Sequence, residues 1–287
     1  MRKLSDNFFN CLKSGFLSGI TEAVKQDPDL NLEIREGYIN VYYKGNSLLK
    51  LDETKSRYKA KIDKKFLKGV NLPLDFNKDT VEQFTGSIPF LKQNIINVSK
   101  DGKRSLEIEY EQMIIRANNL EAQSKTEYLI VDRQYAENKG RFDLTGIFWD
   151  RANHRKNQEV PLCLMEVKFA LNPDIKDVHH QLARYYETIK SHATEFSEEM
   201  QDIFRQKLEL GLYQQSMERI EVLKTLSFSK DINQFQFILI LVDYNPNSKK
   251  LNLENLAKLP FANQVRILFG GFAMWQQNVK PLSDYLS

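Results

Sequence analysis

Two apolar runs of the sequence each have charged residues near one end, and residues of these types at this spacing could do chemistry. Glu166 and Lys168 lie near the end of the run from Val160 to Ala170, and Asp143 lies near the start of the run 141–150. In a strand, side chains two residues apart project from the same face, so Glu166 and Lys168 would lie about 7 Å apart. Ionisable groups on a strand this apolar are costly unless they are paired or bound to a metal. The pattern predicts an ion pair or a metal site at this strand end.

The surrounding sequence predicts the elements that must position these residues. We expect a mostly helical span over 79–121 with a break at Ile88–Pro89, including a helix over Leu106–Leu120, then strands over 127–134, 141–150 and 160–170. A helix over about 174–194, a helical stretch over 197–225 and an apolar strand over 235–243 follow. Turn-forming residues at 137–140 predict that the first two of these strands pair antiparallel. Buried strands flanked by helices predict an α/β sandwich.

The helix after Lys168 has an apolar stripe that would dock on the sheet, formed by Ile175, Val178, Leu182, Tyr185 and Ile189. Gln181 and Tyr185 are four residues apart, so they share a side that borders this stripe. Both side chains could therefore reach the edge of the sheet that holds the charged residues.

Asp143 together with Glu166-Val167-Lys168 resembles the PD-(D/E)xK nuclease superfamily, also called restriction-endonuclease-like. Gln181 and Tyr185 look like the Gln-xxx-Tyr signature of its RecB-like branch. Six [Asp/Glu]-x-Lys triplets occur in the chain, but only the one at 166 ends a buried-type strand that follows a strand with an acidic residue. The resemblance covers roughly 105–190, extends loosely to 235–243 and does not include residues 1–75. Phe142 replaces the family's proline, which varies among members and is not a ligand.

The resemblance implies a fold and an activity. The fold would be α/β (α+β), restriction-endonuclease-like, with a mixed central sheet flanked by helices, and the activity would be metal-dependent hydrolysis of DNA phosphodiester bonds. That reaction needs an attacking hydroxide and neutralisation of the charge on the phosphoryl and leaving oxygens, which suits Mg²⁺ or Mn²⁺ held by carboxylates. Asp143 and Glu166 would be the ligands, and the resemblance implies the backbone carbonyl of Val167 as a further one.

The other candidate residues would act around the cation. Lys168 cannot ligate while it is protonated, but it can orient or help deprotonate the attacking water, and its ammonium can stabilise developing negative charge. Family members often carry an additional acidic residue on the helix before the first strand. Glu111 would bind the metal through water or hold a second ion, with Glu107, one turn earlier, as the alternative. Gln181 and Tyr185 would bind the phosphate or orient Lys168.

Residues 1–75 predict an N-terminal accessory module, and residues 76–287 the nuclease domain, with a catalytic core at about 105–245. The module would have a helix over about 4–26 and a small antiparallel β-meander. Its segment 44–68 has nine basic and three acidic side chains. Lysines displace counterions condensed on nucleic acids, so we expect a phosphate-binding surface formed by Lys59, Lys61, Lys64 and Lys65. The alternative is a solvated lysine-rich face that prevents sheet aggregation.

Composition limits the class of protein. The chain has 287 residues, of which 41% are hydrophobic and 28% charged, as in a folded globular protein. Two cysteines support neither a disulfide framework nor a cysteine-based zinc site, so a cytoplasmic location is expected. The first residues lack a signal peptide's apolar stretch, no run is long enough to span a membrane, and no glycine-rich loop indicates an ATPase.

Several alternatives stay open at this point. Glu166 and Lys168 could form a surface ion pair on an edge strand, with Asp143 a turn residue. A non-catalytic nucleic-acid-binding or scaffold protein on the same fold, or a nuclease that cleaves RNA, would have a similar sequence. Small nucleases of this kind often act in genome defence or repair, which is an association by family. DNA is the expected partner; a protein partner that supplies an ATPase or targeting function, and a homodimer, are left open.

Overall fold

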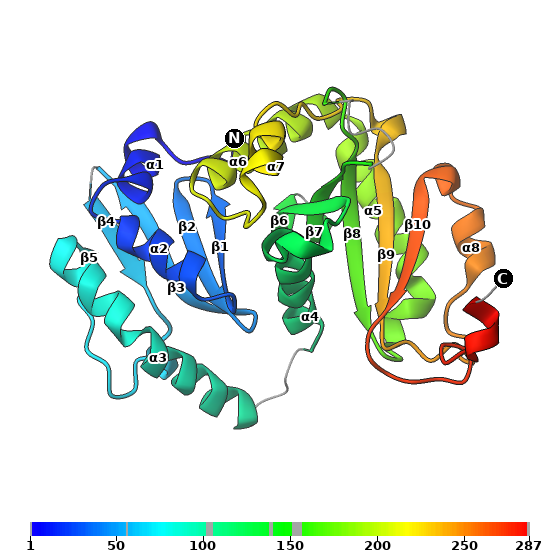
Figure 1. Ribbon diagram of the computed structural model, residues 1–287, viewed down its shortest axis with the longest axis horizontal. Helices are drawn as coiled ribbons and strands as arrows, with labels where there is room; N and C mark the ends of the chain where they lie inside the picture. The colour runs from blue at the N-terminus through cyan, green and yellow to red at the C-terminus, as the bar shows by residue number, and fades with distance from the viewer. Residues whose placement is uncertain (1, 56, 102–105, 138–139, 151–156, 286–287) are drawn as a thin grey trace.

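The computed structural model describes residues 2–55, 57–101, 106–137, 140–150 and 157–285, without the side chains of residues 99–101 and 137. Two five-stranded sheets organise these residues, and helices pack on both (Figure 1). The chain is therefore mixed α/β, as the sequence predicted. Within the described ranges, no helix is long and apolar enough to cross a membrane.

The N-terminal sheet is an antiparallel meander whose strands follow in sequence order: β1 (Leu30–Arg35), β2 (Tyr38–Tyr43), β3 (Asn46–Thr54), β4 (Arg57–Lys61) and β5 (Asp75–Phe76). The meander confirms the sequence-based prediction, and the expected module boundary at 75 falls within β5. Burial alternates along β4, where Tyr58 and Ala60 face the core and Lys59 and Lys61 face solvent. This alternation is the period of two that a half-buried strand requires.

Two helices, not the single one expected over 4–26, precede this sheet. They are α1 (Asp6–Lys13) and α2 (Ser18–Gln26). Between them the chain turns so closely that a Cβ on Gly15 would lie 2.8 Å from the Cα of Cys11. The Thr21 hydroxyl donates to the Leu12 carbonyl at 3.0 Å and joins the two helices. The prediction was wrong because the apolar spacing continues across the turn.

Helix α3 (Lys78–Asp101) packs against the N-terminal sheet and continues through Pro89, so the break expected at Ile88–Pro89 is absent. A proline inside a helix costs roughly 3 kcal/mol because it removes a hydrogen bond and crowds the preceding turn. An apolar stripe at helical spacing outweighs that cost through burial. The stripe consists of Val81, Phe84, Ile88, Leu91 and Ile95.

The second sheet is mixed, in the order β10-β9-β8-β7-β6. Strands β6 (Tyr128–Glu137), β7 (Gly140–Phe148) and β8 (Leu162–Phe169) are antiparallel neighbours, whereas β9 (Gln236–Val242) and β10 (Val265–Gly270) run parallel to β8. The antiparallel pairing expected for the first two strands is confirmed, although residues 138–139 of the turn lie outside the described residues. Strand β10 was not predicted, because it is a short edge strand with most of its residues exposed.

Helices cover the second sheet on opposite faces. The remaining helices are α4 (Leu106–Ile115), followed by a π-helical turn at Arg116–Leu120, then α5 (Val178–Lys190), α6 (Ala193–Glu209), α7 (Met217–Leu223) and α8 (Leu253–Ala257). Alternate residues of β8 face two different cores. Leu162 and Leu164 belong to the core that includes α5, and Cys163 and Met165 belong to the core that includes α4. The helical stretch expected over 197–225 is divided, because Gly211 has a φ of +73° and ends the first helix.

Candidate active site

Asp143, Glu166 and Lys168 meet where β7 lies beside β8. The antiparallel register pairs Leu144 with Met165, which brings Asp143 next to Glu166. Glu166 and Lys168 are both buried and project toward α5, on the same side of β8 as Leu162 and Leu164. The structure therefore brings together the three residues that the sequence singled out.

Glu166 holds two partners at once. One carboxylate oxygen accepts a hydrogen bond from Lys168 Nζ, and the other accepts one from the Tyr185 hydroxyl of α5. Tyr185 packs edge-on against the ring of Phe142, with ring centroids 4.5 Å apart. Burial and the negative charge of Glu166 raise the pKa of Tyr185, so its hydroxyl stays protonated and donates. This contact explains why Tyr185 belongs to the site and to the apolar stripe of α5.

Asp143 is half-buried and is the carboxyl whose protonation the site perturbs most clearly. Its Oδ2 accepts a hydrogen bond from the backbone N–H of Val167 at 2.9 Å. Burial, followed by the negative charges of Glu166 and Glu111, raises the pKa of Asp143 to about 8. A carboxyl held among other carboxylates in this way is an electrostatic environment that a cation would relieve.

Lys168 is buried beside these carboxylates. Burial alone would lower the pKa of its ammonium, but the charges of Glu166, Asp143 and Glu107 outweigh burial and raise it. At neutral pH Lys168 is therefore a charged donor in the metal-free protein. This state favours a role in orienting water or stabilising negative charge over a role as a proton acceptor.

The two acidic residues of α4 have different partners. Glu111 is buried, and its Oε2 accepts from Arg133 Nε at 2.7 Å and from Gln134 Nε2 at 3.1 Å. Glu107 accepts from the side chain of Asn172 and from the backbone N–H of Phe169, the residue after Lys168. Burial raises the pKa of Glu111, and the positive charge of Arg133 partly offsets this. The charge of Glu111 acts on Asp143 and that of Glu107 on Lys168, so both residues lie near the triad although α4 packs on the face of the sheet opposite α5.

Gln181 lies one turn before Tyr185 on α5. Its side-chain oxygen is buried and has no hydrogen-bond partner among the described residues. A buried polar atom without a partner costs free energy unless a ligand or water satisfies it. Val167 joins the site through its N–H group, and the expected role of its carbonyl stays a prediction.

The lysines expected to bind nucleic acid lie at the other end of the molecule. Lys59 and Lys61 are on the exposed face of β4, and Lys64 and Lys65 follow it. Strand β1 lies closest to β6, and β2 and β3 separate it from β4, a width of roughly 15 Å (Figure 1). Lys61 lies 3.7 Å from Asp52 and Lys65 lies 3.1 Å from Asp63, but exposed ion pairs are weak and leave these cations free to meet phosphates.

The donor chemistry suits a hard divalent cation, although the carboxylates do not form a preassembled cage. Among the side chains that the structure describes, no group of three or more His, Cys, Asp or Glu residues is arranged to hold a metal ion. Glu166 is instead hydrogen-bonded to Lys168 and Tyr185, and Glu111 to Arg133. Asp143 nevertheless interacts with both carboxylates strongly enough to shift its pKa. The residues therefore fit Mg²⁺ in type and charge, and loading would require Glu166 to exchange a partner.

The sequence analysis missed the residues that bind the two glutamates. Arg133 and Gln134 belong to β6, and Asn172 to the turn after β8. A signal was present, because Asp132 and Arg133 directly follow the apolar residues Leu129–Val131, as Glu166 and Lys168 lie at the end of their apolar run. That signal marks a buried charge but does not name its partner.

Comparisons with known proteins identify no relative of this chain. The chain matches no protein-family model, no curated protein and no solved structure. The geometry and electrostatics of the site therefore carry the functional argument.

Proposed function

We propose that this protein is a magnesium-dependent nuclease that hydrolyses DNA phosphodiester bonds. The observation that carries the proposal is the meeting of Asp143, Glu166 and Lys168 at the neighbouring strands β7 and β8, with the pKa of Asp143 raised to about 8 by burial and by adjacent carboxylates. Clustered acidic residues repel phosphate, so a protein that only bound nucleic acid would have no use for them. In a catalytic centre that binds a cation, these acidic residues would have a use as its ligands.

The arrangement of the second sheet supports a restriction-endonuclease-like core. Its strands β6, β7 and β8 are antiparallel and β9 and β10 are parallel to β8, with α4 on one face and α5 on the other. The candidate residues follow the order that the family resemblance implies, from Glu111 through Asp143, Glu166 and Lys168 to Gln181 and Tyr185. We therefore assign the α4 residue, the central triad and the α5 pair to one catalytic unit.

The residues of the chain would divide the work of hydrolysis. The Val167 N–H orients Asp143, and the Tyr185 hydroxyl orients Glu166. The ammonium of Lys168 would stabilise the charge that develops on the phosphoryl oxygens and orient the attacking water. Gln181 would accept a hydrogen bond from Lys168 with its unpartnered side-chain oxygen, or donate one to the phosphate from its amide nitrogen. Mg²⁺ held by Asp143 and Glu166 would supply Lewis-acid stabilisation and lower the pKa of the attacking water.

The test is a cleavage assay on the purified protein with supercoiled, linear and single-stranded DNA and with RNA, in Mg²⁺, Mn²⁺ or EDTA. We expect cleavage of DNA with a divalent cation and none with EDTA. Glu166→Gln and Lys168→Met should abolish it. Gln264→Met is the control, because it removes the hydrogen bonds of a buried polar side chain that lies outside the candidate site and outside the contact between the two sheets.

Other outcomes would redirect the proposal. Binding of DNA without cleavage in any of these cations would favour a non-catalytic binding or scaffold protein. Cleavage of RNA alone would change the substrate class and keep the site. Full activity of Glu166→Gln would mean that Glu166 and Lys168 are a structural ion pair.

A further inference from the structure

The helix that carries Glu111 is fastened to the N-terminal sheet by the residue next to it. The side-chain oxygen of Gln112 accepts a hydrogen bond from the backbone N–H of Gly45 at 2.9 Å, and its amide donates to the Asp29 carbonyl at 2.5 Å. Both of these backbone groups belong to the module within residues 1–75. Because Gln112 and Glu111 are consecutive on α4, a shift of the module would move Glu111.

The turn between β2 and β3 touches the same helix. Gly45 has a φ of +74°, and a Cβ on it would lie 2.0 Å from Cγ2 of Ile108. Neither the backbone conformation nor the space at this position admits another residue without displacement. The module therefore packs directly against α4, three residues before Glu111.

Arg133 makes the second connection. It is fully buried, donates to Glu111 at 2.7 Å, and lies over the ring of Tyr42 of β2, with 4.8 Å between its guanidinium carbon and the ring centroid. Arg35 of β1 donates to the backbone carbonyl of Arg133 and to the carboxylate of Asp132. Both the side chain and the backbone of the residue that binds Glu111 are thus held by the N-terminal sheet.

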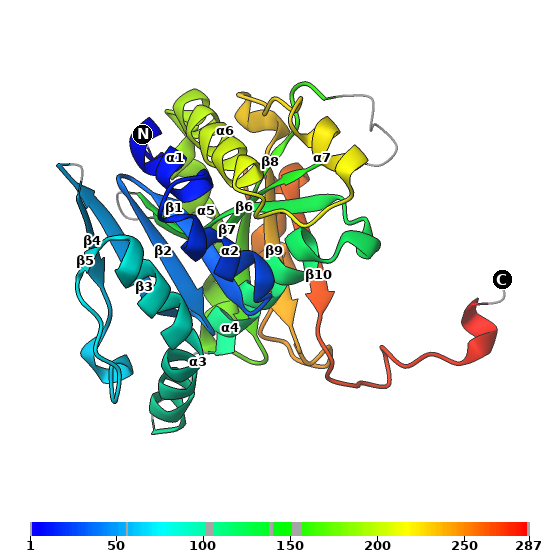
Figure 2. The same ribbon diagram turned by 60° about the vertical axis from the view of Figure 1, so that its left-hand side comes forward.

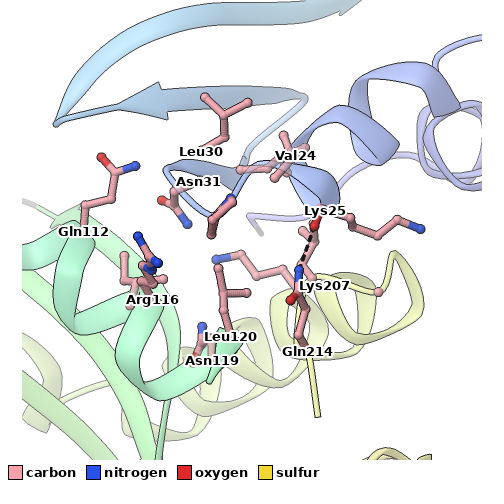
Figure 3. A pocket seen from close by; sticks show the side chains of 15 residues that line it. Val24, Lys25, Leu30, Asn31, Gln112, Arg116, Asn119, Leu120, Lys207 and Gln214 are labelled. Atoms are coloured by element: carbon pink, nitrogen blue, oxygen red, sulfur yellow. Dashed lines mark hydrogen bonds between the residues drawn. The ribbon is translucent and has the colours of Figure 1, made fainter. Parts of the chain in front are cut away.

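Buried charges hold the two sheets together on the other side of this contact. Lys207 of α6 donates to Glu33 of β1 at 2.6 Å and to the Val131 carbonyl of β6 at 2.7 Å. Figure 3 shows Lys207 pointing into the small cavity between the module and the π-helical turn after α4, beside Asn31 and Asn119. The cavity volume is about 30 Å³, enough for one or two waters. Separating the sheets would leave buried charges unpaired, which is strongly unfavourable.

Figure 2 shows this contact from another side, with β1 and α6 both close to β6. From these contacts we propose that the N-terminal module positions Glu111 for the candidate active site, with Gln112, Arg133 and Gly45 as positioning residues. The proposal rests on the proposed nuclease function. It assigns the module a role in the catalytic geometry that is independent of any grip on nucleic acid by its lysines. A ligand's supporting residues typically change metal affinity 10–100-fold when they are removed.

The experiment measures Mn²⁺ affinity by calorimetry on the full chain. Gln112→Met removes the hydrogen bonds to the module and keeps the side-chain volume, and Gly45→Ala forces the module and α4 apart, because its Cβ would clash with Ile108. Each should weaken Mn²⁺ binding by about 10-fold or more and raise the Mg²⁺ concentration needed for half-maximal cleavage, with the KM for DNA unchanged. In Gly45→Ala/Ile108→Ala the 2.0 Å clash is removed, and the closest remaining contact is the 3.0 Å approach to the Cβ of residue 108, but the strained φ remains. Its Mn²⁺ affinity should therefore return to that of Ile108→Ala, while its melting temperature stays low.

Gln264→Met serves as the control for general destabilisation, because Gln264 is as buried as Gln112 and its amide donates to the backbone carbonyls of Ile232 and Phe235, outside the contact between the module and α4. It should lower the melting temperature and leave Mn²⁺ affinity unchanged. If Gln112→Met and Gly45→Ala lower the melting temperature yet bind Mn²⁺ as the unmodified protein does, the positioning role is wrong and the nuclease proposal stands. If the unmodified protein binds no Mn²⁺ and cleaves nothing, the proposed function fails, and this inference fails with it.

Discussion

Replacing Asp143 with asparagine should stabilise the metal-free protein, and the gain should increase with pH. Burial and the carboxylates of Glu166 and Glu111 raise the pKa of Asp143 to about 8, against an ordinary value of 3.8. The stability that this protonated carboxyl contributes is complete below about pH 4 and is lost as the pH rises through about 8. Asparagine keeps an oxygen that can accept the Val167 N–H but removes the charge.

The magnitude follows from the difference between these two pKa values. Each pKa unit corresponds to about 1.4 kcal/mol, which gives about 6 kcal/mol as the upper limit for the gain in the free energy of unfolding. Asp143 is half-buried, so solvent screening reduces the expected gain to about 2–3 kcal/mol above pH 8. In a chain of this length, that gain corresponds to an increase in melting temperature of about 3–5 °C.

The assay is thermal unfolding, followed by circular dichroism in EDTA at pH 5, 7 and 8.5. The melting temperature of Asp143→Asn should exceed that of the unmodified protein by little at pH 5 and by most at pH 8.5. Excess MgCl₂ should narrow the gap, because a cation stabilises the charged form of Asp143. Asp174→Asn, at an exposed position, is the control and should show no such trend. Parallel curves for Asp143→Asn and the unmodified protein across this pH range would refute the reasoning about buried carboxylates.

Three further predictions test other parts of the site. Lys168→Ala should lower kcat by roughly 10²–10³-fold or more, while Mn²⁺ affinity measured by calorimetry stays equal or rises. Loss of metal binding in this variant would contradict the assigned roles. Tyr185→Phe removes the hydroxyl that Glu166 accepts from, so chemical denaturation should show a loss of about 1–2 kcal/mol, and unchanged stability would show that this hydrogen bond is unimportant. A variant with glutamine in place of Lys59, Lys61, Lys64 and Lys65 should bind DNA with a weaker salt dependence, by roughly one unit of slope for each phosphate that is no longer neutralised. Cleavage at saturating DNA should be preserved. An unchanged slope would identify these lysines as a solvated face.

Much of the fold could be predicted because local patterns report which face of an element is buried. The apolar run that ends at Glu166 and Lys168 forms β8, and the stripe of Val178, Leu182, Tyr185 and Ile189 does face the sheet from α5. The antiparallel meander follows from alternating residues and glycine turns. These features depend on periods of 2 and 3.6 residues, which the chain contains without reference to its tertiary partners.

Other features depend on how tertiary packing settles a local conflict. The chain continues as a helix through Pro89, because the burial of a long apolar stripe outweighs the missing hydrogen bond. It turns between α1 and α2 although the apolar spacing continues, because Gly15 allows a close approach to Cys11. A local pattern cannot decide such cases, since the deciding free energy comes from contacts with distant segments.

For the site, the sequence by itself determined which charged side chains lie at buried strand ends: Asp143, Glu166 and Lys168. Only the tertiary structure decided their partners. Glu111 is bound by Arg133, and Arg35 reaches Asp132 across a sequence separation of 97 residues, while Lys207 reaches Glu33 across 174. A buried charge needs an opposite charge or a hydrogen bond, and any suitable residue can provide it. The local sequence therefore shows that a partner is needed, but not which distant residue it is. This is why the sequence predicted a separate N-terminal module, whereas the folded chain packs that module against the helix that carries Glu111.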